Sequence, residues 1–95
     1  MDPYMTKTVL DRKELARIVA ETLVDQLGIS LTEIRPESRI VEDLGADSLE
    51  AVELAIKLEE KFEIEIDDQV AARLVTVQDV IEYLSVTLKV KGEKE

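Results

Sequence analysis

Apolar residues recur at intervals of three and four in three stretches of the chain, and this spacing predicts three long helices. The stretches run from residue 12 to 27, from 48 to about 62 and from 77 to about 88. Each helix has one stripe of positions expected to face the core, so the three helices should bury these stripes against one another. In chain order, the inward positions are Leu15, Ile18, Val19, Thr22, Leu23 and Leu27, then Ala51, Leu54, Ala55, Leu58 and Phe62, then Val77, Val80, Ile81, Leu84 and Leu88.

Capping residues stand at the ends of the same stretches. Asp11, Asp47 and Thr76 each precede a predicted helix and are followed three positions later by an acidic residue, which is typical of an N-cap with its partner. Gly28 follows the first stretch and suits the left-handed conformation that ends many helices. Periodicity and capping therefore predict the same helix boundaries.

The first two helices are joined by 18 residues, 29 to 46, which is long for an irregular connection in a compact domain. We expect its own apolar side chains to hold this loop against the core, with a helical turn near residues 31 to 34. The side chains expected to point inward are Leu31, Ile34, Ile40, Val41 and Leu44.

A short third helix is predicted over residues 68 to 73, with Val70, Ala71 and Leu74 facing inward. Residues 63 to 66 alternate acidic and apolar side chains, but a lone strand would have no partner, so we expect a loop there. The predicted fold is all-α: a small four-helix bundle with three long helices, one short helix and a long loop between the first two.

The chain has 95 residues, which is enough for one small domain. We expect a single folded domain over residues 10–90, a flexible leader over 1–9 and a flexible tail over 91–95. The leader lacks the apolar core of a signal peptide, and no apolar run approaches the roughly 18 residues of a membrane span. We therefore expect a cytoplasmic protein that contacts no membrane. A monomer is the expected oligomeric state, with weak dimerisation as the alternative.

Charge is unevenly distributed along the sequence. There are 22 acidic and 12 basic residues and no histidine, giving a net charge of −10, which argues against nucleic acid and for protein partners with basic surfaces. Eleven of the acids lie between residues 42 and 68, where only Lys57 and Lys61 offset them. The run is either a docking surface or simply a solvated helix face.

The absence of histidine and cysteine limits the chemistry of this chain. Nucleophilic catalysis by a Ser–His or Cys–His pair is impossible within this chain. Catalytic carboxylates need a cleft that shifts their pKa values, and so small a helical protein offers little room for one. No calcium-loop pattern is present, so no metal site is expected. We expect the protein not to be an enzyme.

The residues Asp47-Ser48-Leu49 carry the clearest chemical signal. Gly45 permits a tight turn before them, and Ser48 would be the first residue of the second helix. Its hydroxyl would lie beside unpaired N–H groups and the positive end of the helix dipole, which favours a phosphate. The plainer alternative is that Ser48 only starts a helix.

From about Leu10 to Leu88 the sequence resembles the acyl carrier proteins, in particular the stand-alone type II carriers of fatty-acid biosynthesis. The resemblance rests on the run GADSL at residues 45 to 49, on the acidic helix after it and on TVQDV at residues 76 to 80. It implies that 4′-phosphopantetheine is joined covalently to Ser48. The terminal thiol of this cofactor would hold acyl groups as thioesters. The implied partners are a phosphopantetheinyl transferase and the acyl-processing enzymes of fatty-acid, polyketide or other lipid metabolism.

The resemblance also implies two groups of site residues. Those that would contact partner enzymes are Asp47, Leu49, Glu50, Val52, Glu53, Ile56 and Glu60. Those that would surround the acyl chain, between the second and third helices, are Ile40, Leu54, Ala55, Leu58, Ile66, Ala71 and Leu74. Leu49, Val52 and Ile56 form a second apolar stripe among acidic residues, which favours partial exposure, although a stripe can also merely widen a core face.

The chain departs from the family pattern at five positions. Ile40 replaces a frequent Phe, Ile56 a usual Met and Asp67 a common Pro, while Lys57 and Lys61 replace small or acidic residues. Isoleucine is stiffer than methionine and adapts to fewer partners. We therefore hypothesise a specialised carrier for a dedicated pathway. The alternative from another class is an unmodified acidic interaction module that binds a basic protein.

Overall fold

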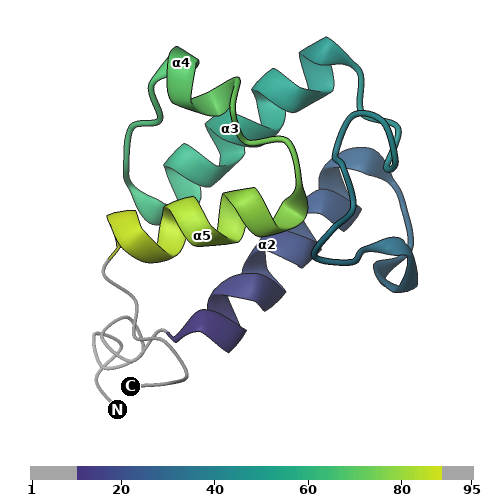
Figure 1. Cartoon of the computed structure of the whole chain (residues 1–95), viewed down its shortest axis with the longest axis horizontal. Coiled ribbons are helices and arrows are strands. Elements are labelled where there is room, and N and C mark those ends of the chain that lie inside the picture. Colours follow the sequence, from purple (N-terminus) through teal and green to yellow (C-terminus); the bar gives the residue numbers. More distant parts are fainter. Residues whose placement is uncertain (1–10, 89–95) are drawn as a thin grey trace.

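The computed structural model describes residues 11–88, which hold four α-helices. These are α2 (Arg12–Leu27), α3 (Ser48–Phe62), α4 (Asp68–Ala71) and α5 (Val77–Thr87), with a 3-10 turn, η1 (Leu31–Glu33), between α2 and α3. In Figure 1, α5 crosses the middle of the molecule, α4 lies at the top and the long loop after α2 forms the right-hand side. The predicted all-α bundle of three long helices and one short helix is confirmed. Leu10 and the predicted leader and tail lie outside the described residues.

Capping explains where α2 begins and ends. The Asp11 carboxylate accepts a hydrogen bond from the Glu14 amide at 2.8 Å, as the sequence predicts. Gly28 adopts a φ of +68°, and its amide donates to the Val24 carbonyl at 2.9 Å. A left-handed residue at this position lets the chain leave the helix while satisfying one of its last carbonyls.

The core forms around α2, which contacts both α3 and α5. Leu15, Val19 and Leu23 of α2 are fully buried, and α5 adds a fully buried Leu84. Burying one such side chain stabilises the fold by about 1.5–3 kcal/mol. The remaining buried apolar residues are Ile40, Leu44, Ala46, Leu54, Leu58, Ile66, Val77, Val80 and Ile81. Most of the predicted stripe positions of the three long helices therefore meet in one cluster. Ile18, Ala51 and Ala55 are only half-buried and lie outside it.

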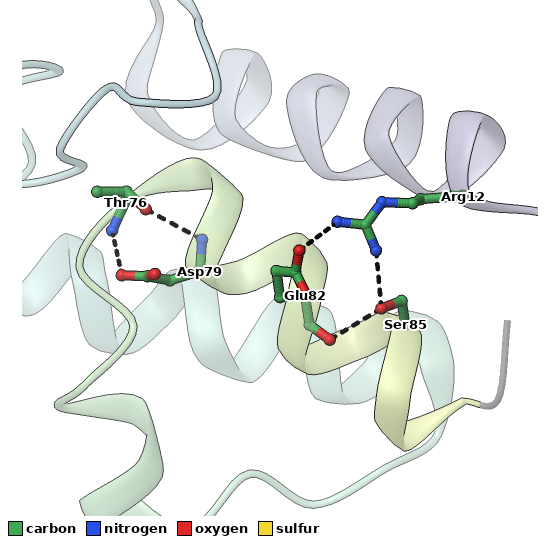
Figure 2. A network of polar contacts seen from close by, with 5 residues as sticks. All are labelled: Arg12, Thr76, Asp79, Glu82 and Ser85. Atoms are coloured by element: carbon green, nitrogen blue, oxygen red, sulfur yellow. Dashed lines mark hydrogen bonds and ion pairs between the residues drawn. The ribbon is translucent and has the colours of Figure 1, made fainter. Parts of the chain in front are cut away.

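Polar contacts fix the two ends of α5 (Figure 2). At its start, the Thr76 hydroxyl accepts from the Asp79 amide and the Asp79 carboxylate accepts from the Thr76 amide, both at 3.0 Å. Nearer its end, the Arg12 guanidinium donates to Glu82 at 2.7 Å and to the Ser85 hydroxyl at 3.0 Å. This second contact ties the first turn of α2 to the last helix.

The long loop is only partly as predicted. The single turn at η1 is confirmed, and Ile40 and Leu44 are buried, but Leu31 is 57% exposed and Val41 is 52% exposed. The amides of residues 43 and 44 both bond the Arg39 carbonyl, forming a helix-like turn. In such a turn positions 40 and 44 share a face and position 41 points away, so the inward prediction for Val41 was wrong. Leu31 starts the single turn η1 and lines a surface groove, where it stays exposed, so its inward prediction was wrong as well.

The segment between α3 and α5 is an extended loop followed by a very short helix. The loop is anchored where the Glu59 carboxylate accepts from the Ile66 amide at 2.7 Å, and Ile66 is buried, as predicted. The predicted helix over 68 to 73 ends earlier, at Ala71, because the next turn tightens: the Arg73 amide bonds the Val70 carbonyl.

Candidate functional site

The start of α3 is held in place by the loop before it. Gly45 has a φ of +82°, a conformation that disfavours any residue with a Cβ, although the space around it is open. Leu44 and Ala46 on either side are buried, and the Ala46 amide donates to the Ile40 carbonyl at 3.2 Å. Two anchored neighbours and a glycine turn therefore fix the direction in which the chain enters α3.

Asp47 and Glu50 cap this helix reciprocally. The Asp47 carboxylate accepts from the Glu50 amide at 2.8 Å, and the Glu50 carboxylate accepts from the Asp47 amide at 3.1 Å. The amides of Ser48 and Leu49, the first two of the helix, donate to no atom within residues 11–88. Two free donors at the positive end of the helix dipole therefore lie next to the Ser48 side chain.

Ser48 differs from the other three serines of the chain. Ser38 and Ser85 are buried and hydrogen-bonded, and the exposed Ser30 hydroxyl caps η1. The Ser48 residue is exposed, and its hydroxyl has no hydrogen-bond partner within the described residues. A free hydroxyl can be esterified, and the unpaired amides beside it are donors that fit the oxygens of a phosphodiester.

An apolar stripe with acidic edges runs along the outside of α3 from this point. Leu49, Val52 and Ile56 are 65%, 55% and 46% exposed, which confirms their predicted exposure and excludes the alternative of a wider core face. Among the predicted contact residues, Asp47, Glu53 and Glu60 are exposed and Glu50 is half-buried. The structure thus brings all seven predicted contact residues to one helix and its cap.

The predicted acyl residues lie inside the bundle instead. Four of them are buried in the core and three are half-buried, and they come from the loop, α3, α4 and the segments flanking α4. The four buried residues are Ile40, Leu54, Leu58 and Ile66, and the half-buried ones are Ala55, Ala71 and Leu74. All except Ala55 belong to, or pack against, the main hydrophobic cluster.

Two surface grooves lie elsewhere, and neither is lined by those residues. One, of about 620 Å³, lies between α2, η1 and the end of α3, with Leu31 and Phe62 in its lining. The other, of about 420 Å³, lies between α2 and α3, where Gln26 donates to the Glu53 carboxylate at 2.8 Å. Sequence reasoning missed this second groove, because no pattern in the sequence pairs two residues 27 positions apart.

The acidic residues in the loop before Ser48 are partly neutralised by an arginine, whereas the lysines on α3 neutralise none of the described acids. Arg39, in the loop, pairs with Glu42 at 2.7 Å and Asp43 at 3.5 Å. The hydrogen bond from the Arg39 amide, together with the charge and side-chain contact of that arginine, lowers the pKa of Asp43. On α3, by contrast, neither Lys57 nor Lys61 forms an ion pair with any described residue.

Neither a metal centre nor a membrane span emerges from the part of the chain that the structure describes. Residues 11–88 contain no group of three or more metal-ligating side chains. None of the helices in that range has the length and apolar character required to cross a bilayer.

Comparison with known proteins decides the family. Residues 17–84 match the protein-family model described as "Phosphopantetheine attachment site". The chain is 52% identical over 66 residues to the acyl carrier protein of Campylobacter concisus (strain 13826), covering 70% of this chain and 86% of that protein. The chain belongs to the acyl carrier protein family.

Two further relatives agree with this assignment. The acyl carrier protein of Helicobacter hepaticus is 52% identical over 66 residues, covering 70% of this chain and 87% of the relative. That of Nitratidesulfovibrio vulgaris (strain DP4) is 49% identical over 67 residues, covering 70% and 88%. Membership implies a covalently attached 4′-phosphopantetheine and interaction with acyl-processing enzymes, so this acyl carrier protein is a carrier rather than an unmodified acidic module.

Proposed function

We propose that Ser48 is the residue that carries phosphopantetheine in this acyl carrier protein. The observation that carries the proposal is that Ser48 alone among the four serines combines exposure with a hydroxyl that has no partner in residues 11–88. The free amides of Ser48 and Leu49 and the helix dipole would stabilise the negative charge of the phosphodiester. When bound, the group supplies a terminal thiol that holds acyl chains as thioesters.

The acidic face of α3 is proposed to bind the enzymes that load and process the cargo, beginning with a phosphopantetheinyl transferase. Leu49, Val52 and Ile56 offer an apolar contact about two helical turns long, and Glu53 and Glu60 flank it. Charges at the rim of such an interface speed association with a basic partner, while the apolar centre supplies most of the affinity. The residues themselves need perform no catalysis, since the enzymes would supply it.

The proposed acyl site is the cluster between α3 and the α4 region. Its side chains are apolar, and α4 is a single short turn with half-buried residues, Val70 and Ala71. An element with so little buried surface separates from its neighbours at lower cost than a long helix does. Fatty-acid biosynthesis is the proposed pathway, and the specialised role, the cytoplasmic location and the monomeric state stay predictions.

The experiment is an intact-mass measurement of the apo-protein after incubation with coenzyme A and a broad-specificity phosphopantetheinyl transferase. We expect the wild type and Ser30→Ala to gain one phosphopantetheine and Ser48→Ala to gain none. Ser30 is the matched control, because it is also exposed and also lies at the start of a helical turn. Modification of Ser48→Ala would contradict the assignment.

A further inference from the structure

One positive charge interrupts the acidic face of α3 beside the apolar stripe. Lys57 lies one turn after Glu53 and three residues before Glu60, and all three side chains line the groove of about 420 Å³ between α2 and α3. Such spacing normally favours an ion pair along the helix. Yet the Lys57 ammonium pairs with no acid in residues 11–88.

The contact across the groove gives one physical reason. The Glu53 carboxylate, the natural partner of Lys57, instead accepts a hydrogen bond from the Gln26 amide of α2 at 2.8 Å. This bond joins two helices, and it turns Glu53 toward α2. The exposed Lys57 ammonium therefore remains available to a partner molecule.

Lys57 also lies within the surface that an enzyme docked on α3 would cover. It follows Ile56, which is 46% exposed and lines the same groove, so a surface that covers Ile56 also meets the ammonium group. A partner with a Lys or Arg at this position would bring it against the unpaired Lys57 ammonium. The two positive charges would repel each other at the edge of the apolar contact, where water is excluded. Like-charge contacts of this kind disfavour wrong partners more strongly than matched charges improve right ones.

Resting on the proposed docking role of α3, we propose that Lys57 determines partner specificity. It favours an enzyme that presents a carboxylate to the groove between α2 and α3. It disfavours an enzyme whose docking surface is basic throughout. The partner that fits is thus basic opposite Glu50 and Glu60, apolar opposite Val52 and Ile56, and acidic opposite Lys57.

The first test measures kcat/KM for phosphopantetheine loading by a broad-specificity transferase with a basic docking surface. Lys57→Glu should raise kcat/KM about three- to tenfold, mainly through a lower KM, and the gain should shrink at about 0.5 M salt. Lys13→Glu is the control, because it makes the same charge change on an exposed residue about 20 Å from Gln26 along α2. An equal gain in both variants would assign the effect to net charge and overturn the proposal, as would an unchanged or lower rate for Lys57→Glu.

The second test introduces into the transferase the carboxylate that Lys57 is proposed to favour in a partner. Each Lys or Arg on the docking surface of the same transferase is changed singly to Glu, and every variant is assayed with the wild-type carrier and with Lys57→Glu. The proposal expects at least one transferase variant that loads the wild type faster than Lys57→Glu, reversing the order seen with the parent enzyme. No reversal across the surface would refute the contact. Failure of the wild type to be loaded at all would instead refute the attachment role of Ser48.

Discussion

Replacing Asp47 with alanine should destabilise the protein by removing the cap that fixes the start of α3. The change deletes the acceptor of the Glu50 backbone amide, a bond of 2.8 Å. Only the second bond of the pair is kept, from the backbone amide of residue 47 to the Glu50 carboxylate at 3.1 Å. Loss of an N-cap typically costs about 0.5–2 kcal/mol. For a domain of this size, 1 kcal/mol lowers Tm by roughly 4–8 °C.

Charge complicates this measurement, and a second variant separates the two effects. The protein carries a net charge of −10, so removing any carboxylate from the acidic region relieves some repulsion and adds apparent stability. Asp47→Asn removes the same charge but keeps an oxygen that caps almost as well. The difference between Asp47→Asn and Asp47→Ala therefore isolates the hydrogen bond.

The assay is urea unfolding followed by far-UV circular dichroism, at low salt and at about 0.5 M salt. We expect Asp47→Ala to unfold at a lower urea concentration than Asp47→Asn by about 0.5–1 M, since the urea m-value of a small domain is about 1–2 kcal/mol per M. The gap between the variants should not depend on salt. Equal urea midpoints for the two variants would show that the hydrogen bond between the Asp47 side chain and the Glu50 amide does not hold the start of α3, and hence Ser48, in place.

Two other predictions concern the core and the acid dependence of stability. Leu84→Ala should lower the free energy of unfolding by about 2–5 kcal/mol, because Leu84 is fully buried. The control Val86→Ala changes a residue that is 74% exposed and should alter it by less than about 0.5 kcal/mol. Similar losses in both variants would contradict the packing of α5. The Thr76 and Val75 amides donate to the Asp79 carboxylate and lower the pKa of Asp79 below its ordinary value of 3.8. This carboxylate therefore contributes stability above about pH 4 that is lost as pH falls through the lowered pKa, so Asp79→Asn should be less stable than the wild type at pH 7 and equal to it near pH 2. A difference independent of pH would show that ionisation of Asp79 contributes nothing.

Helix boundaries were predictable from the sequence because local interactions set them. Asp11, Asp47 and Thr76 each bond an amide three residues later, and such short-range geometry depends little on the rest of the fold. The same holds for Gly28, whose left-handed φ follows from its place after the last turn of α2. The position of Ser48 at the start of α3, and hence the main element of the candidate site, followed from these local rules.

Features that depend on contacts between distant segments were not predictable in the same way. Leu31 and Val41 are apolar residues in a loop without periodicity, so nothing in the sequence indicated that they would be exposed. The groove beside Lys57 exists because α2 and α3 pack together and Gln26 reaches Glu53. Its partner-selecting character could therefore be inferred only after the helices were placed.

Tandem mass spectrometry of the loaded wild-type protein after proteolysis can show directly whether Ser48 carries the prosthetic group. We expect phosphopantetheine on the peptide that contains residue 48, with fragmentation placing it on the Ser48 side chain. The peptides that contain Ser30, Ser38 and Ser85 should be unmodified. Phosphopantetheine on one of those serines, with an unmodified Ser48, would refute the assignment of Ser48 as the attachment residue.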